Sequence, residues 1–111
     1  MKTISLLAVH LLTTTVLILG VSASAHAQEK ATQLHNRATA AMCANCHGTD
    51  GRTIEGSAIP SLVGMPKDYM VLQMKAFKDG SRPATVMHQI TKGLTDAQID
   101  TISSYYAAIK R

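Results

Sequence analysis

The hydrophobic positions are clearest near the end of the chain, where four apolar side chains recur three or four positions apart: Ile99, Ile102, Tyr106 and Ile109. This spacing places them on one face of a helix. Thr95 precedes the segment and Gln98 stands three positions later, which is the pattern of a capping box. Asp96 in the first turn suits the positive end of a helix dipole. The pattern predicts a terminal helix that begins after Thr95 and buries its apolar face.

Three further helices are predicted upstream. An Ala-rich segment favours a first helix over residues 31–44. A second helix takes Pro66 as its first residue and stops at Gly80, and a short third one covers residues 84–92. Residues 48–64 are rich in Gly, Ser and Pro and indicate a loop, which at this length is usually functional. With no alternating strand pattern of useful length, the sequence predicts an all-α fold.

The first 27 residues follow another pattern. Lys2 precedes an apolar stretch over residues 4–21, and Ala25-His26-Ala27 resembles a small-residue cleavage site. This is the layout of a secretory signal peptide, so we expect residues 1–27 to be removed and the protein to be periplasmic. Cleavage after Ala25 and an uncleaved membrane anchor are the alternatives. Polar interruptions in the apolar stretch favour cleavage, which leaves one domain over residues 28–111 and no membrane span.

Composition adds two constraints. A domain this short buries little apolar core and usually needs a metal, a disulfide or a cofactor to stabilise it. The 11 basic and 7 acidic residues give a formal net charge of +4. The basic residues form no run, and the aromatic residues are not interleaved with them, so we do not expect nucleic-acid binding. The scattered lysines indicate a solvated surface or, less simply, a docking patch for an acidic partner.

The two cysteines carry the candidate chemistry. Cys43 and Cys46 are separated by two residues and His47 follows directly, which fits the C-x-x-C-H haem-attachment sequence. The two thiols can form thioethers with the haem vinyl groups, and the histidine can then bind the iron. A redox disulfide is the first alternative, but such a pair normally lies between a strand and a helix, and no strand is predicted here. A structural zinc site is the second, and it could take its remaining ligand only from His35 or His88.

A second axial ligand is expected further along the chain. A methionine thioether there raises the reduction potential, which suits an electron carrier. Four methionines follow the motif: Met65, Met70, Met74 and Met87. Met70 and Met74 are four positions apart in a predicted amphipathic helix, a spacing more typical of core residues. Position along the chain favours Met87, with Met65 and a bis-histidine pairing through His88 as alternatives.

These motifs together resemble the class I c-type cytochromes. The resemblance extends over residues 28–111 and rests on four blocks: residues 41–51, 59–64, 87–95 and 102–106. It implies a class I cytochrome c fold, with three to four helices around one covalently attached haem c. The chain also resembles single domains of periplasmic dihaem cytochromes and the monohaem cytochrome subunit of flavocytochrome c sulfide dehydrogenase.

The resemblance implies specific roles. Pro60 offers its carbonyl to His47 and orients it, Met87 is the second axial ligand, and Tyr105 or Tyr106 packs across the first helix. In the family a glycine and a large aromatic often mark that crossing. This chain departs from the pattern with Ala38, Ala40 and Ala41.

The expected function is one-electron transfer by a periplasmic cytochrome. The resemblance favours a subunit that accepts electrons from an FAD-containing sulfide dehydrogenase. A freely diffusing carrier between redox proteins and a haem-based sensor are the alternatives. Nothing in the sequence indicates a catalytic acid, base or nucleophile of the chain itself.

Overall fold

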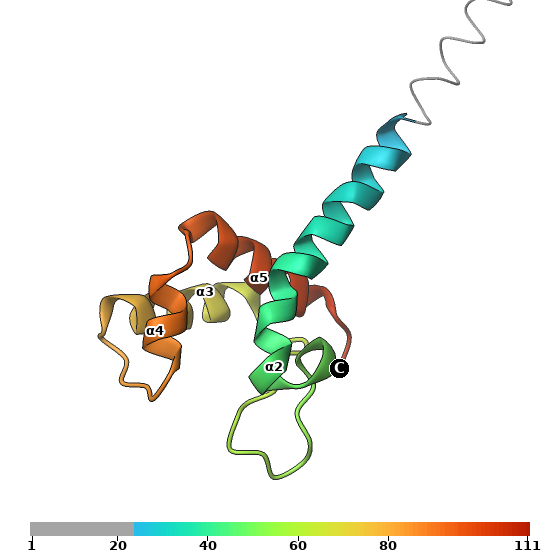
Figure 1. Cartoon of the computed structure of the whole chain (residues 1–111). Helices are drawn as coiled ribbons and strands as arrows, with labels where there is room; N and C mark the ends of the chain where they lie inside the picture. The colour runs from blue at the N-terminus through green and yellow to red at the C-terminus, as the bar shows by residue number, and fades with distance from the viewer. Residues whose placement is uncertain (1–23) are drawn as a thin grey trace, which may run out of the picture. The chain divides into compact units, whose positions relative to one another are not determined.

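The computed structural model describes residues 24–111, which form helices joined by turns and loops, with no strand among them. The expected all-α fold is thus confirmed for this range. Residues 24–40 are helical and lead into the short helices η1 (Ala41–Cys43) and α2 (Ala44–His47) (Figure 1). The remaining elements, in chain order, are η2 (Thr49–Gly51), α3 (Lys67–Asp79), α4 (Met87–Lys92) and α5 (Asp96–Ala108).

The signal peptide predicted for residues 1–27 lies almost entirely outside the described range. The chain divides into two units, residues 1–34 and 35–111. Within the first unit, residues 24–34 are helical and exposed. None of the helices described has the length and apolar content needed to cross a bilayer.

The first helix begins earlier than expected. Its start was predicted at Ala31, but residues 24–30 are already helical. No Gly or Pro lies in residues 24–30, and the Thr32 hydroxyl donates to the Gln28 carbonyl one turn back. Nothing therefore stops the helix at the predicted boundary. At its other end, the helical path continues through η1 and α2 as far as His47.

Helix α3 confirms the second predicted helix with one correction. Pro66 is the residue before the helix, with φ −55° and ψ 132°, rather than its first helical residue. Its carbonyl accepts the Met70 amide at 3.1 Å, the role of an N-cap. Gly80 ends the helix in the left-handed conformation, with φ 85°. Such a glycine after a helix satisfies the final carbonyls without a Cβ penalty.

Helix α4 is shorter than predicted. It begins at Met87 rather than Ala84: residues 85 and 86 form a bend, and the Val86 carbonyl accepts the Gln89 and Ile90 amides.

Helix α5 confirms the prediction closely. The Thr95 hydroxyl accepts the Gln98 amide at 3.2 Å, and the Gln98 side chain accepts the Thr95 amide at 2.9 Å. This is the reciprocal capping box expected from the sequence. Ile99, Ile102 and Tyr106 are buried, whereas Ile109 is the C-cap residue and is half-buried.

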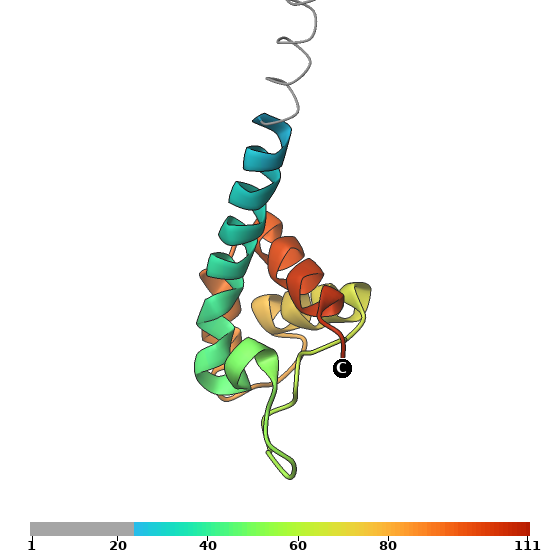
Figure 2. The ribbon, with the colours of Figure 1, turned by 90° about the vertical axis from the view of Figure 1, so that its right-hand side faces the viewer.

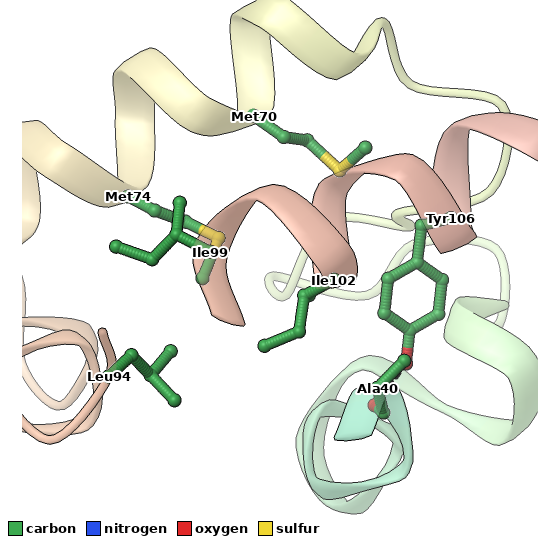
Figure 3. Close-up of a cluster of buried hydrophobic side chains, with 7 residues drawn as sticks. All are labelled: Ala40, Met70, Met74, Leu94, Ile99, Ile102 and Tyr106. Atoms are coloured by element: carbon green, nitrogen blue, oxygen red, sulfur yellow. Dashed lines mark hydrogen bonds between the residues drawn. The ribbon is translucent and has the colours of Figure 1, made fainter. Parts of the chain in front are cut away.

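The core lies between α3 and α5. Seven buried side chains form it: Ala40, Met70, Met74, Leu94, Ile99, Ile102 and Tyr106. Figure 3 shows Met70 and Met74 reaching from α3 toward α5, which is the core role that their spacing predicted. Helix α4 packs on α3, and the Lys78 ammonium of α3 donates to the Leu94 carbonyl at 2.7 Å just before α5 begins.

Ala40 and Tyr106 meet where the first helix passes α5. The Tyr106 hydroxyl donates to the Ala40 carbonyl at 2.8 Å, and both residues are buried (Figure 3). The small Ala40 side chain lets the tyrosine reach the helix backbone.

Candidate functional site

The C-x-x-C-H motif occupies the end of the first helical path. Cys43 is the last residue of η1, while Cys46 and His47 lie in α2. Cys46 is exposed and Cys43 is half-buried, and no disulfide joins them. Residues three apart in a helical turn lie on the same side, so the two thiols are neighbours on one surface.

The His47 ring is buried and is hydrogen-bonded through one of its two nitrogens. Its side chain is 8% exposed, and Nδ1 lies 2.7 Å from the Pro60 carbonyl oxygen. A carbonyl can only accept a hydrogen bond, so Nδ1 carries the ring proton and donates it. Nε2 then keeps its lone pair, which is the arrangement of a histidine that binds a metal through Nε2.

The loop after His47 brings Pro60 back to the histidine. Gly48 and Gly51 both have positive φ, 79° and 77°. The Gly51 carbonyl accepts two hydrogen bonds at 2.8 Å, from the Leu62 amide and the Ser61 hydroxyl. The sequence indicated Pro60 but not Ser61, since one serine in a polar loop gives no signal that its hydroxyl binds the Gly51 carbonyl. Figure 2 shows residues 52–60 as a loop that projects outward.

Burial raises the pKa of the Cys43 thiol, and the neighbouring Tyr106 side chain only partly offsets this. Burial likewise raises the pKa of Tyr106 above its ordinary value, with further contributions from Cys43, Tyr105 and Asp50. Redox-active cysteines instead have lowered pKa values.

The zinc alternative gains no geometric support. Across residues 24–111, no three side chains of His, Cys, Asp and Glu gather as a metal site. His35 is exposed on the first helix, and His88 lies in α4 with its Nδ1 buried and without a hydrogen-bond partner.

The four methionine candidates differ in how they contribute to the core. Met70 and Met74 are buried in the core, and Met65 packs against it. Met87 is half-buried at the start of α4 and belongs to neither set. The buried Thr91 hydroxyl donates to the Met87 carbonyl at 2.8 Å, which fixes the first turn of α4. Met87 therefore remains the predicted second ligand, with a thioether that the core does not use.

Exposed apolar side chains adjoin the proposed ligands. Ile59 precedes Pro60 and is 40% exposed, while Val86 and Ile90 flank Met87 and are 54% and 37% exposed. Large apolar side chains gathered in such segments often mark a binding surface. Together with two neighbouring thiols and a free Nε2, they fit a flat, apolar macrocycle attached at Cys43 and Cys46.

A comparison with known families agrees with the haem-attachment motif at Cys43, Cys46 and His47. The family model described as cytochrome c matches residues 36–109. The chain belongs to the cytochrome c family. Its members are electron carriers, and the motif in this cytochrome establishes haem c, one per chain, as its cofactor.

Individual relatives refine the comparison. The cytochrome is 41% identical over 69 residues to the cytochrome subunit of sulfide dehydrogenase from Chlorobaculum tepidum, an alignment covering 62% of this chain and 61% of that protein. It is 35% identical over 100 residues to cytochrome c4 from Pseudomonas aeruginosa, covering 90% of this chain and 48% of the relative. The chain thus spans about half to three fifths of these relatives' lengths.

A solved structure shows the same fold. Cytochrome c4 of Acidithiobacillus ferrooxidans superposes with a TM-score of 0.57 at 34% sequence identity, over 60% of this chain and 38% of that one. The class I cytochrome c fold expected from the sequence is therefore confirmed.

Proposed function

We propose that this chain is a periplasmic monohaem cytochrome that carries single electrons and receives them from a flavoprotein of the sulfide dehydrogenase type. Cys43 and Cys46 would hold the haem as thioethers, and His47 and Met87 would bind its iron. The haem supplies the one-electron exchange between Fe(III) and Fe(II). The observation that most directly supports His47 as an iron ligand is the 2.7 Å contact between its Nδ1 and the Pro60 carbonyl.

The residues of the chain set the conditions for that exchange. The Pro60 carbonyl fixes the tautomer and the orientation of the His47 ring and makes Nε2 more basic. A thioether ligand from Met87 would raise the reduction potential of the iron.

The ligand assignment has a direct spectroscopic test. Met87→Ala is expected to abolish the methionine-to-iron charge-transfer band at the red end of the oxidised spectrum. Met65→Ala, a matched control on a methionine packed against the core, is expected to retain it. A band that persists in Met87→Ala would assign the ligand elsewhere. A wild-type spectrum without the band would favour an open sixth position and the sensor alternative.

The partner assignment is supported by the relative from Chlorobaculum tepidum, which is named as a sulfide dehydrogenase subunit. The experiment is a pull-down of the natively exported cytochrome, followed by haem and flavin spectra of the eluate. A flavoprotein that elutes with wild type is the expected result. The control is the chain with Cys43→Ala and Cys46→Ala, which cannot attach haem. A monomeric haem protein without flavin would favour the free carrier.

Export is tested separately. We propose that residues 1–27 are a cleaved signal peptide, as their sequence pattern indicates. Intact mass measurement of the periplasmic protein is expected to give a chain that begins at Gln28 and carries one haem. A mass that includes residues 1–27 would contradict cleavage and would support the anchor alternative.

A further inference from the structure

The residue that follows Pro60 in the chain makes contacts that can hold the Pro60 carbonyl against His47. We propose that Ser61 is a positioning residue, whose hydroxyl bond to Gly51 fixes the Pro60 carbonyl and thereby sets the electron affinity of the haem iron. The proposal rests on His47 being an axial ligand, as argued above. Ser61 is exposed, and its hydroxyl lies 2.8 Å from the Gly51 carbonyl oxygen.

Gly51 is a firm anchor for this bond. Its amide donates to the Gly48 carbonyl at 2.8 Å, so it is tied to the residue that directly follows His47. Gly51 is buried, and a Cβ there would come within 2.6 Å of the Tyr106 ring. His47 is thus linked to Ser61 in two ways. One runs along the chain to Gly51 and through the hydrogen bond from Ser61, and the other runs through the contact between His47 and the Pro60 carbonyl.

The Ser61 hydroxyl bond compensates for a hydrogen bond that Pro60 cannot make. Pro60 has no amide proton, so its own backbone cannot donate a hydrogen bond to fix it. The Leu62 amide donates to the Gly51 carbonyl, but a single bond leaves the preceding peptide free to rotate. The Pro60 carbonyl and the Ser61 nitrogen share one rigid peptide plane. A second bond from the Ser61 side chain to the same carbonyl therefore restricts the direction of the Pro60 oxygen.

That direction matters for the iron. A histidine that donates Nδ1–H to a well-aligned acceptor is a more basic ligand through Nε2. A more basic ligand stabilises Fe(III) over Fe(II). Pro60 is exposed, so water can compete for its carbonyl once the peptide loosens. Removal of the Ser61 hydroxyl is therefore expected to shift the equilibrium toward Fe(II).

The test compares three variants of the haem-loaded protein. Ser61→Ala removes the hydroxyl, and Ser61→Thr keeps it. Ser57→Ala is the matched control, because the Ser57 hydroxyl accepts the Ile59 amide at 3.1 Å within the same loop. Two quantities are measured in each: the midpoint potential, and the solvent exchange of the His47 Nδ1 proton by nuclear magnetic resonance in the ferrous state.

Ser61→Ala is expected to change the Fe(II)/Fe(III) equilibrium constant about threefold, or ~28 mV upward at 59 mV per tenfold change for one electron. Its His47 Nδ1 proton is expected to exchange faster. Ser61→Thr and Ser57→Ala are expected to match wild type in both measurements. A merely structural role for Ser61 would not move the potential or the ring proton.

Two outcomes overturn the proposal. One is a Ser61→Ala protein with wild-type potential and proton exchange. The other is a Ser61→Thr protein that shifts as far as Ser61→Ala, because the hydroxyl would then not be the cause. A pyridine haemochrome spectrum of each protein separates these results from a failure of the proposed function, in which the wild type itself carries no attached haem.

Discussion

The hydrogen bond between Tyr106 and the first helix can be tested by removing one oxygen atom. The Tyr106 hydroxyl donates to the Ala40 carbonyl at 2.8 Å, and the side chain is 1% exposed. Tyr106→Phe keeps the ring but leaves a buried carbonyl without this donor. Ala40 is the N-cap residue of η1, so its carbonyl also accepts the first amide of that helix, and the variant loses one hydrogen bond without leaving the acceptor empty. The net contribution of one such bond is about 0.5–1.5 kcal/mol, so we expect a loss of about 1 kcal/mol in unfolding free energy.

Tyr105→Phe is the matched control. Its hydroxyl lies 3.5 Å from an Asp50 carboxylate oxygen and is exposed, so its loss is expected to cost less than about 0.5 kcal/mol. The measurement is guanidinium unfolding of the haem-loaded proteins, followed by far-UV circular dichroism. The midpoint of thermal unfolding falls about 4–8 °C per kcal/mol in domains of about 60–100 residues, so Tyr106→Phe is expected to lower it by roughly 4–8 °C. Equal losses in the two variants would refute the reasoning.

Two other predictions concern the loop and the charges. Gly51→Ala is expected to destabilise the protein by about 1–3 kcal/mol more than Gly56→Ala, as measured by denaturant unfolding, since both have φ 77° but only Gly51 lacks room for a Cβ. Equal costs would show that the loop yields. The pKa of Asp96 is lowered, first by a hydrogen bond from Lys78 and then by the charges of Lys78 and Lys75. The ionised Asp96 therefore stabilises the fold fully above the ordinary carboxyl pKa, and this stabilisation is lost as pH falls through the lower pKa of the folded state. Lys78→Gln is expected to weaken the acid dependence of stability below about pH 4, while Lys92→Gln, which removes a lysine of α4, leaves it unchanged; identical acid titrations for wild type and Lys78→Gln would contradict this.

Periodicity and capping made α5 predictable. The Thr95–Gln98 capping box and the buried Ile99 and Ile102 depend only on local spacing, which the sequence displays directly. The first helix was predicted less well, because its start depends on the absence of a stop signal. Helix α4 was predicted too long, since its start depends on a bend that residue propensities do not specify.

The site was predictable where covalent chemistry dictates spacing. Cys43, Cys46 and His47 are adjacent in sequence because they must be adjacent in space. Pro60 was inferred from family resemblance, and its 2.7 Å contact with His47 is a property of the folded loop. The two bonds to the Gly51 carbonyl join residues about ten positions apart, and no periodicity reports such a contact.

The methionine core has a consequence for oxidative damage. Methionine sulfoxide places a polar, chiral group where a flexible apolar side chain was, and it disrupts a packed interior. Met70 and Met74 are buried between α3 and α5, whereas Met42, next to the attachment motif, is 49% exposed. An oxidant in solution therefore reaches Met42 more readily than Met70 or Met74, at a position where a sulfoxide oxygen can remain hydrated. The interior thioethers become accessible only when α3 separates from α5, so their oxidation would record opening of the fold.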